Sequence, residues 1–491
     1  MARGLLKNRL PARPSSPVFP GNSNTESYDA ITENRFRSVQ NAPLSTFSID
    51  VDTASYSNAR RFLSQGQRPP TGSIRIEELV NYFNYNYQPP VGNQPFSVHM
   101  EVGPAPWAPE HRLLHIGLQG KRIASDALPP RNLVFLIDVS GSMSSPNKLP
   151  LLKRSFKALM ESMREQDTVS MVVYAGASGL VLPPTSGNRR SEIFAALDRL
   201  QAGGGTNGAS GIELAYQVAR ERFNPGGVNR VILATDGDFN IGATSQSDLA
   251  ELIEEKRKSG VFLTALGFGM GNYKDSTMEQ LANKGNGNYA YIDDYKEARK
   301  VLVEQAGGTL VTIAKDVKIQ VEMNPAVVGA YRLIGYENRV LQTQDFNDDK
   351  KDAGEIGAGH TVTAIYEILT PAQAKQTLKV DGLRYQKPAQ LSQGKGELAT
   401  VKLRYKTPLG TQSELAEFPV AYKVKSLSET SNAYRFSAAV ANFGMLLRSS
   451  QFAGSSNFET VQGLARAALG RDRNGYRTEF LSLVNSARKL R

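Results

Sequence analysis

The sequence predicts an α/β fold in which a doubly wound, mainly parallel sheet is inserted into a discontinuous β-rich sandwich, followed by a C-terminal helical segment. Short apolar runs alternate with helical segments between residues 133 and 305, which is the pattern of parallel strands joined by helices. Strand-like sequence flanks this region on both sides, and helical segments close the chain from residue 432 onward. Insertion of one domain into an exposed turn of another accounts for this order.

Length and composition favour several folded domains. The 491 residues exceed what one hydrophobic core organises, and 40% hydrophobic with 21% charged residues is typical of globular chains. No run approaches the roughly 18 apolar residues needed to cross a bilayer, so no transmembrane segment is predicted. The absence of cysteine excludes disulfides, thiolate metal sites and cysteine nucleophiles.

Five segments are expected along the chain. Residues 1–42 form a flexible lead-in, because a basic start is followed by four prolines and not by the apolar segment of a signal peptide. Residues 43–125 hold helices and then strands, residues 126–305 the inserted domain, residues 306–428 a β-rich domain, and residues 429–491 the helical segment. The strands of the second and fourth segments are expected to pair.

The inserted domain is expected to alternate strands with helices, in right-handed crossovers. Its predicted strands are 133–137, 168–175, 230–235, 261–267 and 288–292. Its predicted helices are 149–164, 189–200, 208–222, 246–259, 275–284 and one from residue 294.

The flanking regions carry the remaining elements. Predicted strands are 96–102, 112–118, 316–322, 330–335, 361–369, 377–380, 398–405 and 417–423. A helix is expected near 54–64, and three more at 432–449, 457–469 and 475–490. The helix within 436–447 is apolar on most sides, so we expect it to pack inside the protein.

Oxygen-bearing side chains follow two predicted strands of the inserted domain. In doubly wound sheets ligands bind beyond the carboxyl ends of the strands. Asp138, Ser140 and Ser142 follow strand 133–137, Asp236 follows strand 230–235, and a glycine-rich turn ends at Thr206. Hydroxyls and carboxylates without His or Cys suit a hard cation, Mg²⁺ foremost, with Mn²⁺ or Ca²⁺ as alternatives. Such a site leaves a coordination position that an incoming carboxylate can complete.

These five residues match a known pattern in order: DxSxS, then Thr, then Asp. The region therefore resembles von Willebrand factor A (vWA) domains with a metal-ion-dependent adhesion site. The resemblance implies that the two serines and Thr206 contact the metal through their hydroxyls, and that the two aspartates act directly or through water. It also implies a protein partner that donates an Asp or Glu carboxylate.

The resemblance extends to both flanks. Residues 45–56 (STFSIDVDTASY) and 76–83 (IEELVNYF) are similar to the N-terminal region of a bacterial family of vWA proteins, and residues 436–447 and 475–480 (GYRTEF) to its C-terminal domain. This implies a place in the cell envelope or periplasm, with the cytoplasm as the alternative.

The resulting functional hypothesis is a metal-dependent protein-binding module without enzymatic activity. The alternatives are an accessory subunit of an ATPase or chaperone-like complex, and a metal-dependent hydrolase. No His and Ser stand in a recognisable catalytic order, and no phosphate loop is present. Asp50 to Thr53 matches a phosphatase motif (DxDxT), but residues 44–49 are too polar for the buried strand it needs.

The net charge of +11 does not predict a nucleic-acid partner. From residue 435 onward the sequence contains nine basic and three acidic residues, but no nucleic-acid-binding motif accompanies them. A solvated helical face accounts for this charge.

Overall fold

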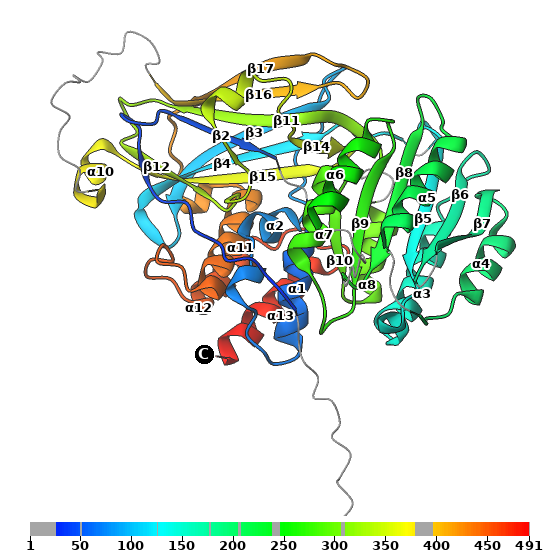
Figure 1. The fold of residues 1–491 in the computed structure, drawn as a ribbon. Coiled ribbons are helices and arrows are strands. Elements are labelled where there is room, and N and C mark those ends of the chain that lie inside the picture. Colours follow the sequence, from blue (N-terminus) through cyan, green and yellow to red (C-terminus); the bar gives the residue numbers. More distant parts are fainter. Residues whose placement is uncertain are drawn as a thin grey trace, which may run out of the picture.

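A computed structural model describes residues 26–49, 52–124, 126–175, 178–204, 208–237, 246–305, 310–378 and 396–490. Figure 1 shows the parallel sheet and its helices on one side of the molecule and the β-rich sheets on the other, with the C-terminal helices beneath the β-rich sheets. No helix in this part of the chain is long and apolar enough to cross a bilayer.

The inserted domain has a sheet with the strand order β10-β9-β8-β5-β6-β7. Its strands are β5 (Arg131–Asp138), β6 (Thr168–Tyr174), β7 (Ser178–Ser186), β8 (Val228–Thr235), β9 (Phe262–Phe268) and β10 (Tyr289–Ile292). All neighbours are parallel except β7, which runs antiparallel to β6. The central strands β5 and β8 are buried at every residue, as expected for strands covered on both faces.

Helices cover both faces of this sheet. They are α3 (Leu149–Met160), α4 (Arg190–Arg199), α5 (Gly208–Glu221), α6 (Gln246–Arg257), α7 (Asp275–Lys284) and α8 (Tyr295–Arg299), which continues as a π-helical turn at Lys300–Glu304. Phe135 packs in one buried cluster with Phe156 of α3, and its neighbour Leu136 packs in another with Ile212 of α5. Successive residues of β5 thus face opposite layers, which confirms the doubly wound arrangement.

The β-rich part consists of two antiparallel sheets, ordered β1-β12-β15-β4-β3 and β13-β2-β11-β16-β17. The first contains β1 (Arg37–Ser38), β3 (Phe96–Ala105), β4 (Ala108–Gly120), β12 (Ala330–Ile334) and β15 (Thr361–Leu369). The second contains β2 (Leu44–Ser48), β11 (Thr312–Met323), β13 (Val340–Leu341), β16 (Glu397–Lys406) and β17 (Ser413–Ala421), with β14 (Gly354–Gly357) paired to β11.

Strands from before and after the inserted domain pair directly. β4 lies antiparallel to β15, and β2 lies antiparallel to β11. One buried cluster joins the two sheets and contains Phe47, Ile116, Val321 and Tyr366. This pairing confirms that the parallel domain is inserted into a discontinuous sandwich.

Two segments differ from the sequence prediction. Residues 44–48 form the buried strand β2 despite their polarity, because neighbouring elements bond their hydroxyls: Tyr366 donates to Ser45 Oγ and Gln320 to Thr46 Oγ1, both at 2.9 Å. The predicted strand 377–380 is wrong at its described end, where Pro371–Leu378 forms α10. Proline is favoured at a helix start, where its missing N–H costs nothing. Asp50 of the phosphatase-like motif lies outside the described residues.

The edge strand β7 had no counterpart in the prediction. It contains Pro183 and Pro184, which cannot donate to a strand ladder. Its burial alternates irregularly, and its pairing with β6 has register shifts. Proline is tolerated at a sheet edge, so only the position of β7 beside β6 allows this sequence to be a strand.

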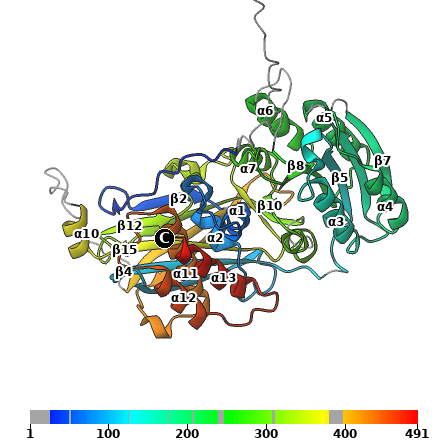
Figure 2. The ribbon, with the colours of Figure 1, turned by 90° about the horizontal axis from the view of Figure 1, so that it is seen from below.

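The C-terminal helices are α11 (Asn432–Arg448), α12 (Phe458–Ala467) and α13 (Tyr476–Lys489). They pack in one cluster with α1 (Ala54–Ser64) and α2 (Ile76–Asn81), and Figure 2 shows this layer lying across the sandwich. Every residue of α11 from Phe436 to Arg448 is buried. A Cβ added at Gly444 would meet Ile76 at 2.9 Å, so glycine permits the close approach of α2. The prediction that this helix packs within protein is confirmed.

Removing the N-cap of α11 is expected to lower the free energy of unfolding by about 1 kcal/mol. Ser431 Oγ accepts the Tyr434 N–H at 3.1 Å and donates to Glu101 of β3 at 2.6 Å. Ser431→Ala removes both bonds, and chemical denaturation measures the loss. Ser482→Ala, at an exposed position within α13, should change stability by less than about 0.5 kcal/mol. Equal effects of the two substitutions would contradict the capping role.

Candidate metal centre

Two carboxylates lie at the carboxyl ends of adjacent parallel strands. Asp138 ends β5, and Asp236 follows Thr235, the last residue of β8. The two strands are in register at Ile137 and Ala234, which brings their end loops together. Both aspartates are 0% exposed, so each needs a compensating partner inside the protein.

Hydrogen bonds from both loops hold the Asp138 carboxylate. Oδ1 accepts the Ser140 N–H at 2.8 Å, and Oδ2 accepts the Thr235 hydroxyl at 2.8 Å. Thr235 Oγ1 in turn accepts the Gly237 N–H at 3.1 Å. The loop after β5 and the loop after β8 are thus joined through one carboxylate, which fixes its orientation.

The two serines share a 3₁₀ turn at Gly141–Ser144 and its N-cap. Their hydroxyl oxygens are 3.0 Å apart. Ser140 is buried, whereas Ser142 is exposed. The Ser140 hydroxyl therefore lies on the inner side of the site, and the Ser142 hydroxyl lies on its outer side.

The glycine-rich turn lies against this loop, as the sequence predicted. The Gly141 N–H donates to Gly204 O at 3.2 Å, and the Gly203 N–H donates to Val139 O at 2.8 Å. The next residues, 205–207, lie outside the described residues, and so does the predicted ligand Thr206. The structure thus brings Asp138, Ser140, Ser142 and Asp236 together, and Thr206 stays a prediction.

Lys148 and Asn272 complete the surroundings of Asp236, and sequence reasoning missed both. Lys148 Nζ lies 2.9 Å from Asp236 Oδ2 and 2.9 Å from Asn272 Oδ1, and Asn272 Nδ2 donates to Asp236 Oδ2 at 3.1 Å. A Cβ on Gly269 would strike Lys148 Cε at 2.2 Å. The sequence feature that could have indicated Lys148 is the Gly267–Phe268–Gly269 segment, because Gly269 leaves room for the lysine side chain.

The two aspartates differ in their electrostatics. Burial raises the pKa of Asp138, and the charge of Asp236 raises it further, against hydrogen bonds from Ser140 and Thr235. Burial also raises the pKa of Asp236, but the charge and hydrogen bond of Lys148 outweigh it, so the net pKa is lowered. Among the described residues, Asp138 is thus bonded by neutral donors and, unlike Asp236, not by a cation.

This donor set fits a divalent ion. Two carboxylates and two hydroxyls without nitrogen or sulfur ligands are the chemistry of Mg²⁺, Mn²⁺ and Ca²⁺ sites. Burial makes the ionised form of Asp138 less stable, and a bound cation would stabilise that form. When bound, such an ion supplies a Lewis acid for an incoming oxygen ligand.

Three segments match known families. Residues 132–304 match the von Willebrand factor type A domain, residues 22–115 match a family described as von Willebrand factor, and residues 308–490 match the family described as uncharacterized protein YfbK, C-terminal. Domains of the vWA type are generally adhesion or interaction modules.

The chain is 44% identical to "Uncharacterized protein YfbK" of Escherichia coli (strain K12) over 475 residues, 95% of this chain and 82% of that protein. It is 29% identical over 168 residues to human inter-alpha-trypsin inhibitor heavy chain H4, covering 32% of this chain and 18% of that one. A solved von Willebrand factor type A structure from Catenulispora acidiphila is similar with a TM-score of 0.45 and 16% identity, over 83% of this chain and 89% of that one. The chain therefore belongs to the YfbK family of von Willebrand factor type A proteins.

Proposed function

We propose that this protein is a metal-dependent protein-binding module. A Mg²⁺-type ion is held by Asp138, Ser140, Ser142 and Asp236, together with Thr206, and it grips an Asp or Glu carboxylate of a protein partner. The observation that carries the proposal is the convergence of two buried carboxylates and two hydroxyls at the ends of β5 and β8.

The asymmetry of the site supports binding of an external ligand. Both carboxylates are buried, whereas Ser142 is exposed. The Ser142 side therefore offers a partner an approach to the ion, where the protein contributes neutral oxygens. A neutral outer side leaves the ion enough positive charge to attract an anionic ligand.

The site is better suited to holding an ion than to acid–base catalysis. Asp236 is paired with Lys148, and Asp138 is fixed by Ser140 and Thr235. A general base must be free to take a proton from a bound substrate. The similarity of the domain to an inter-alpha-trypsin inhibitor heavy chain supports an interaction role in preference to a hydrolase. From the family resemblance, we also propose that the protein is located in the cell envelope or periplasm.

Asp138→Ala is expected to weaken Mg²⁺ binding at least tenfold, or about 1.4 kcal/mol, because it removes a buried ligand. Calorimetric titration with Mg²⁺ measures the affinity, and circular dichroism checks that the fold is retained. Asp198→Ala is the control: Asp198 lies in the same domain with its side chain 59% exposed and pairs with Lys157. Equal affinities of Asp138→Ala and the unchanged chain would exclude this site.

Affinity capture tests the partner. The full chain is used as bait with Mg²⁺ or with a chelator, beside Asp138→Ala. We expect a protein that is retained only by the unchanged chain with Mg²⁺. Retention that survives both the chelator and the substitution would contradict a metal-dependent grip, and an ATPase as the captured protein would favour the accessory-subunit alternative.

A further inference from the structure

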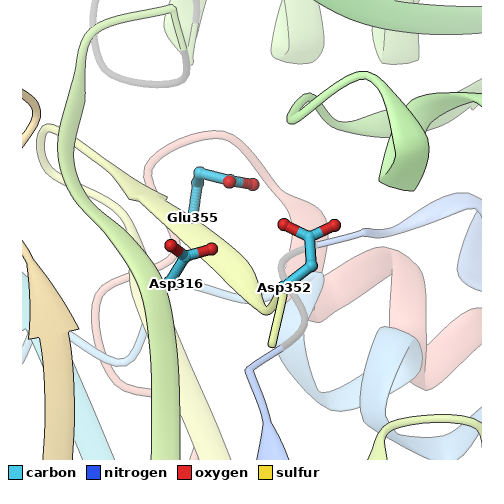
Figure 3. Close-up of side chains that lie close together, drawn as sticks. All are labelled: Asp316, Asp352 and Glu355. Carbon is cyan, nitrogen blue, oxygen red and sulfur yellow. The ribbon is translucent and has the colours of Figure 1, made fainter. Parts of the chain in front are cut away.

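A second group of acidic side chains lies outside the site described above. One carboxylate oxygen each from Asp316, Asp352 and Glu355 lies within 4.8 Å of the others. Figure 3 shows the three carboxylates turned toward a common gap. Asp316 belongs to β11, Glu355 to β14, and Asp352 precedes β14.

A β-bulge places Asp316 in this group. The pairing of β11 with β14 shifts register between Ala314 and Val317, and its pairing with β16 shifts between Lys315 and Lys318. Asp316 has a φ of 51°, which a non-glycine residue adopts only at a cost. A bulge turns a side chain away from the direction that regular alternation would give it.

Cations compensate two of the three carboxylates. Lys406 Nζ lies 2.7 Å from Asp316 Oδ2, and Arg257 Nη1 lies 2.7 Å from Asp352 Oδ2. Lys406 belongs to β16 of the sandwich, whereas Arg257 ends α6 of the inserted domain. The group therefore lies where the two domains meet.

Glu355 is the exception. Its Oε1 is closed off from solvent and has no hydrogen-bond partner among the described residues. Burial raises the pKa of Glu355 well above its usual value, and the charges of Asp352 and Asp316 raise it further, against those of Arg257 and Arg230. A buried acceptor without a partner is destabilising, and a bound cation would supply the missing partner of this oxygen.

We propose that Asp316, Asp352 and Glu355 bind a divalent cation of the Ca²⁺ type in the sandwich, beside its contact with the inserted domain. Ca²⁺ accepts several carboxylates in irregular geometry, whereas Mg²⁺ demands near-octahedral geometry and keeps most of its waters. A cavity of about 160 Å³ borders Asp352 and Glu355 and has room for water ligands. Lys406 and Arg257 reduce the affinity of the site for the cation, because they pair with Asp316 and Asp352. Neither of them forms an ion pair with Glu355, which can therefore bind the cation.

Calorimetric titration with CaCl₂ tests this site in a chain that carries Asp138→Ala, so that the first site does not contribute. We expect one Ca²⁺ per chain, and at least tenfold weaker binding when Glu355→Gln is added. Glu417→Gln is the control, because Glu417 is an exposed acid of the same sheet. Ca²⁺ should also raise the melting temperature of the Asp138→Ala chain, since a ligand that binds only the folded state stabilises it.

Glu355→Gln should abolish the rise in melting temperature and, without Ca²⁺, leave that temperature close to the parent value, because the amide has the size and shape of the carboxyl group that it replaces. If this variant does not fold, Asp352→Asn takes its place. No Ca²⁺ binding by the Asp138→Ala chain, or equal binding by all variants, would overturn the proposal in favour of a proton shared among the acids. Neither result depends on whether Mg²⁺ binds at Asp138.

Discussion

Replacing Arg60 with methionine is expected to lower the free energy of unfolding by about 3–5 kcal/mol, because it leaves the buried Asp293 carboxylate without its cation. The Arg60 side chain is 6% exposed. It lies 2.5 Å from Asp293 Oδ1, 2.7 Å from Glu297 Oε2 and 2.9 Å from Glu479 Oε1. Methionine keeps most of the apolar volume, so the loss reports mainly the charge.

This arginine connects three parts of the chain. It belongs to α1, Asp293 follows β10, Glu297 belongs to α8, and Glu479 belongs to α13. Substitution should therefore loosen the contact between the inserted domain and the C-terminal helices. Limited proteolysis should cleave this variant faster than the unchanged chain.

Chemical denaturation with a matched control measures the effect of Arg60→Met. Arg189 also pairs with a glutamate, Glu192, at 2.7 Å, but the two side chains are 62% and 40% exposed. Arg189→Met should cost less than about 1 kcal/mol. A loss of similar size in both variants would show that burial of the Arg60 cluster adds nothing.

Acid is expected to destabilise the protein between about pH 6.5 and pH 4 through His115, which is buried, and His360, which is partly buried. Burial lowers the pKa of His115 to about 4, and burial with the charge of Arg230 lowers that of His360 to about 4. In the unfolded chain both titrate near 6.5. Below that pH the unfolded state binds protons that the folded state does not, so stability falls as the pH falls.

The expected loss is about 3 kcal/mol for each histidine once the pH reaches 4, from about 1.4 kcal/mol per unit of pKa difference. His115 is the better test, because it is 3% exposed and its Nε2 lies 3.1 Å from the Tyr87 hydroxyl. The free energy of unfolding, measured by denaturation at several pH values, should fall less steeply with falling pH in His115→Gln than in the unchanged chain. Parallel curves for the two chains would mean that His115 is not held neutral.

The alternation of strands and helices was predictable because parallel strands buried on both faces are largely apolar. β5 and β8 each contain a continuous apolar run, at 133–137 and 231–234, and their order along the chain also put Asp138 and Asp236 in end loops. Short motifs suffice for this part of the site because Ser140 and Ser142 are bonded within their own loop.

Strands with other compositions were not predictable from local pattern. β2 contains Ser45, Thr46 and Ser48, and it is stable because side chains far away in the sequence satisfy their hydroxyls. β7 contains two prolines, which only an edge position tolerates. The partners of Asp236 were missed for the same reason, since Lys148 and Asn272 are distant in sequence and meet only beside Gly269.

The sequence by itself determined the class of fold, the insertion and the loops that carry Asp138, Ser140, Ser142 and Asp236, because local patterns and the order of the elements along the chain indicate each of them. Tertiary structure alone decided which charges are compensated. Lys148 is paired with Asp236, while Asp316, Asp352 and Glu355 meet only because β11 bulges beside β14. The physical reason is that burial sets the cost of a charge, and burial depends on contacts between distant segments.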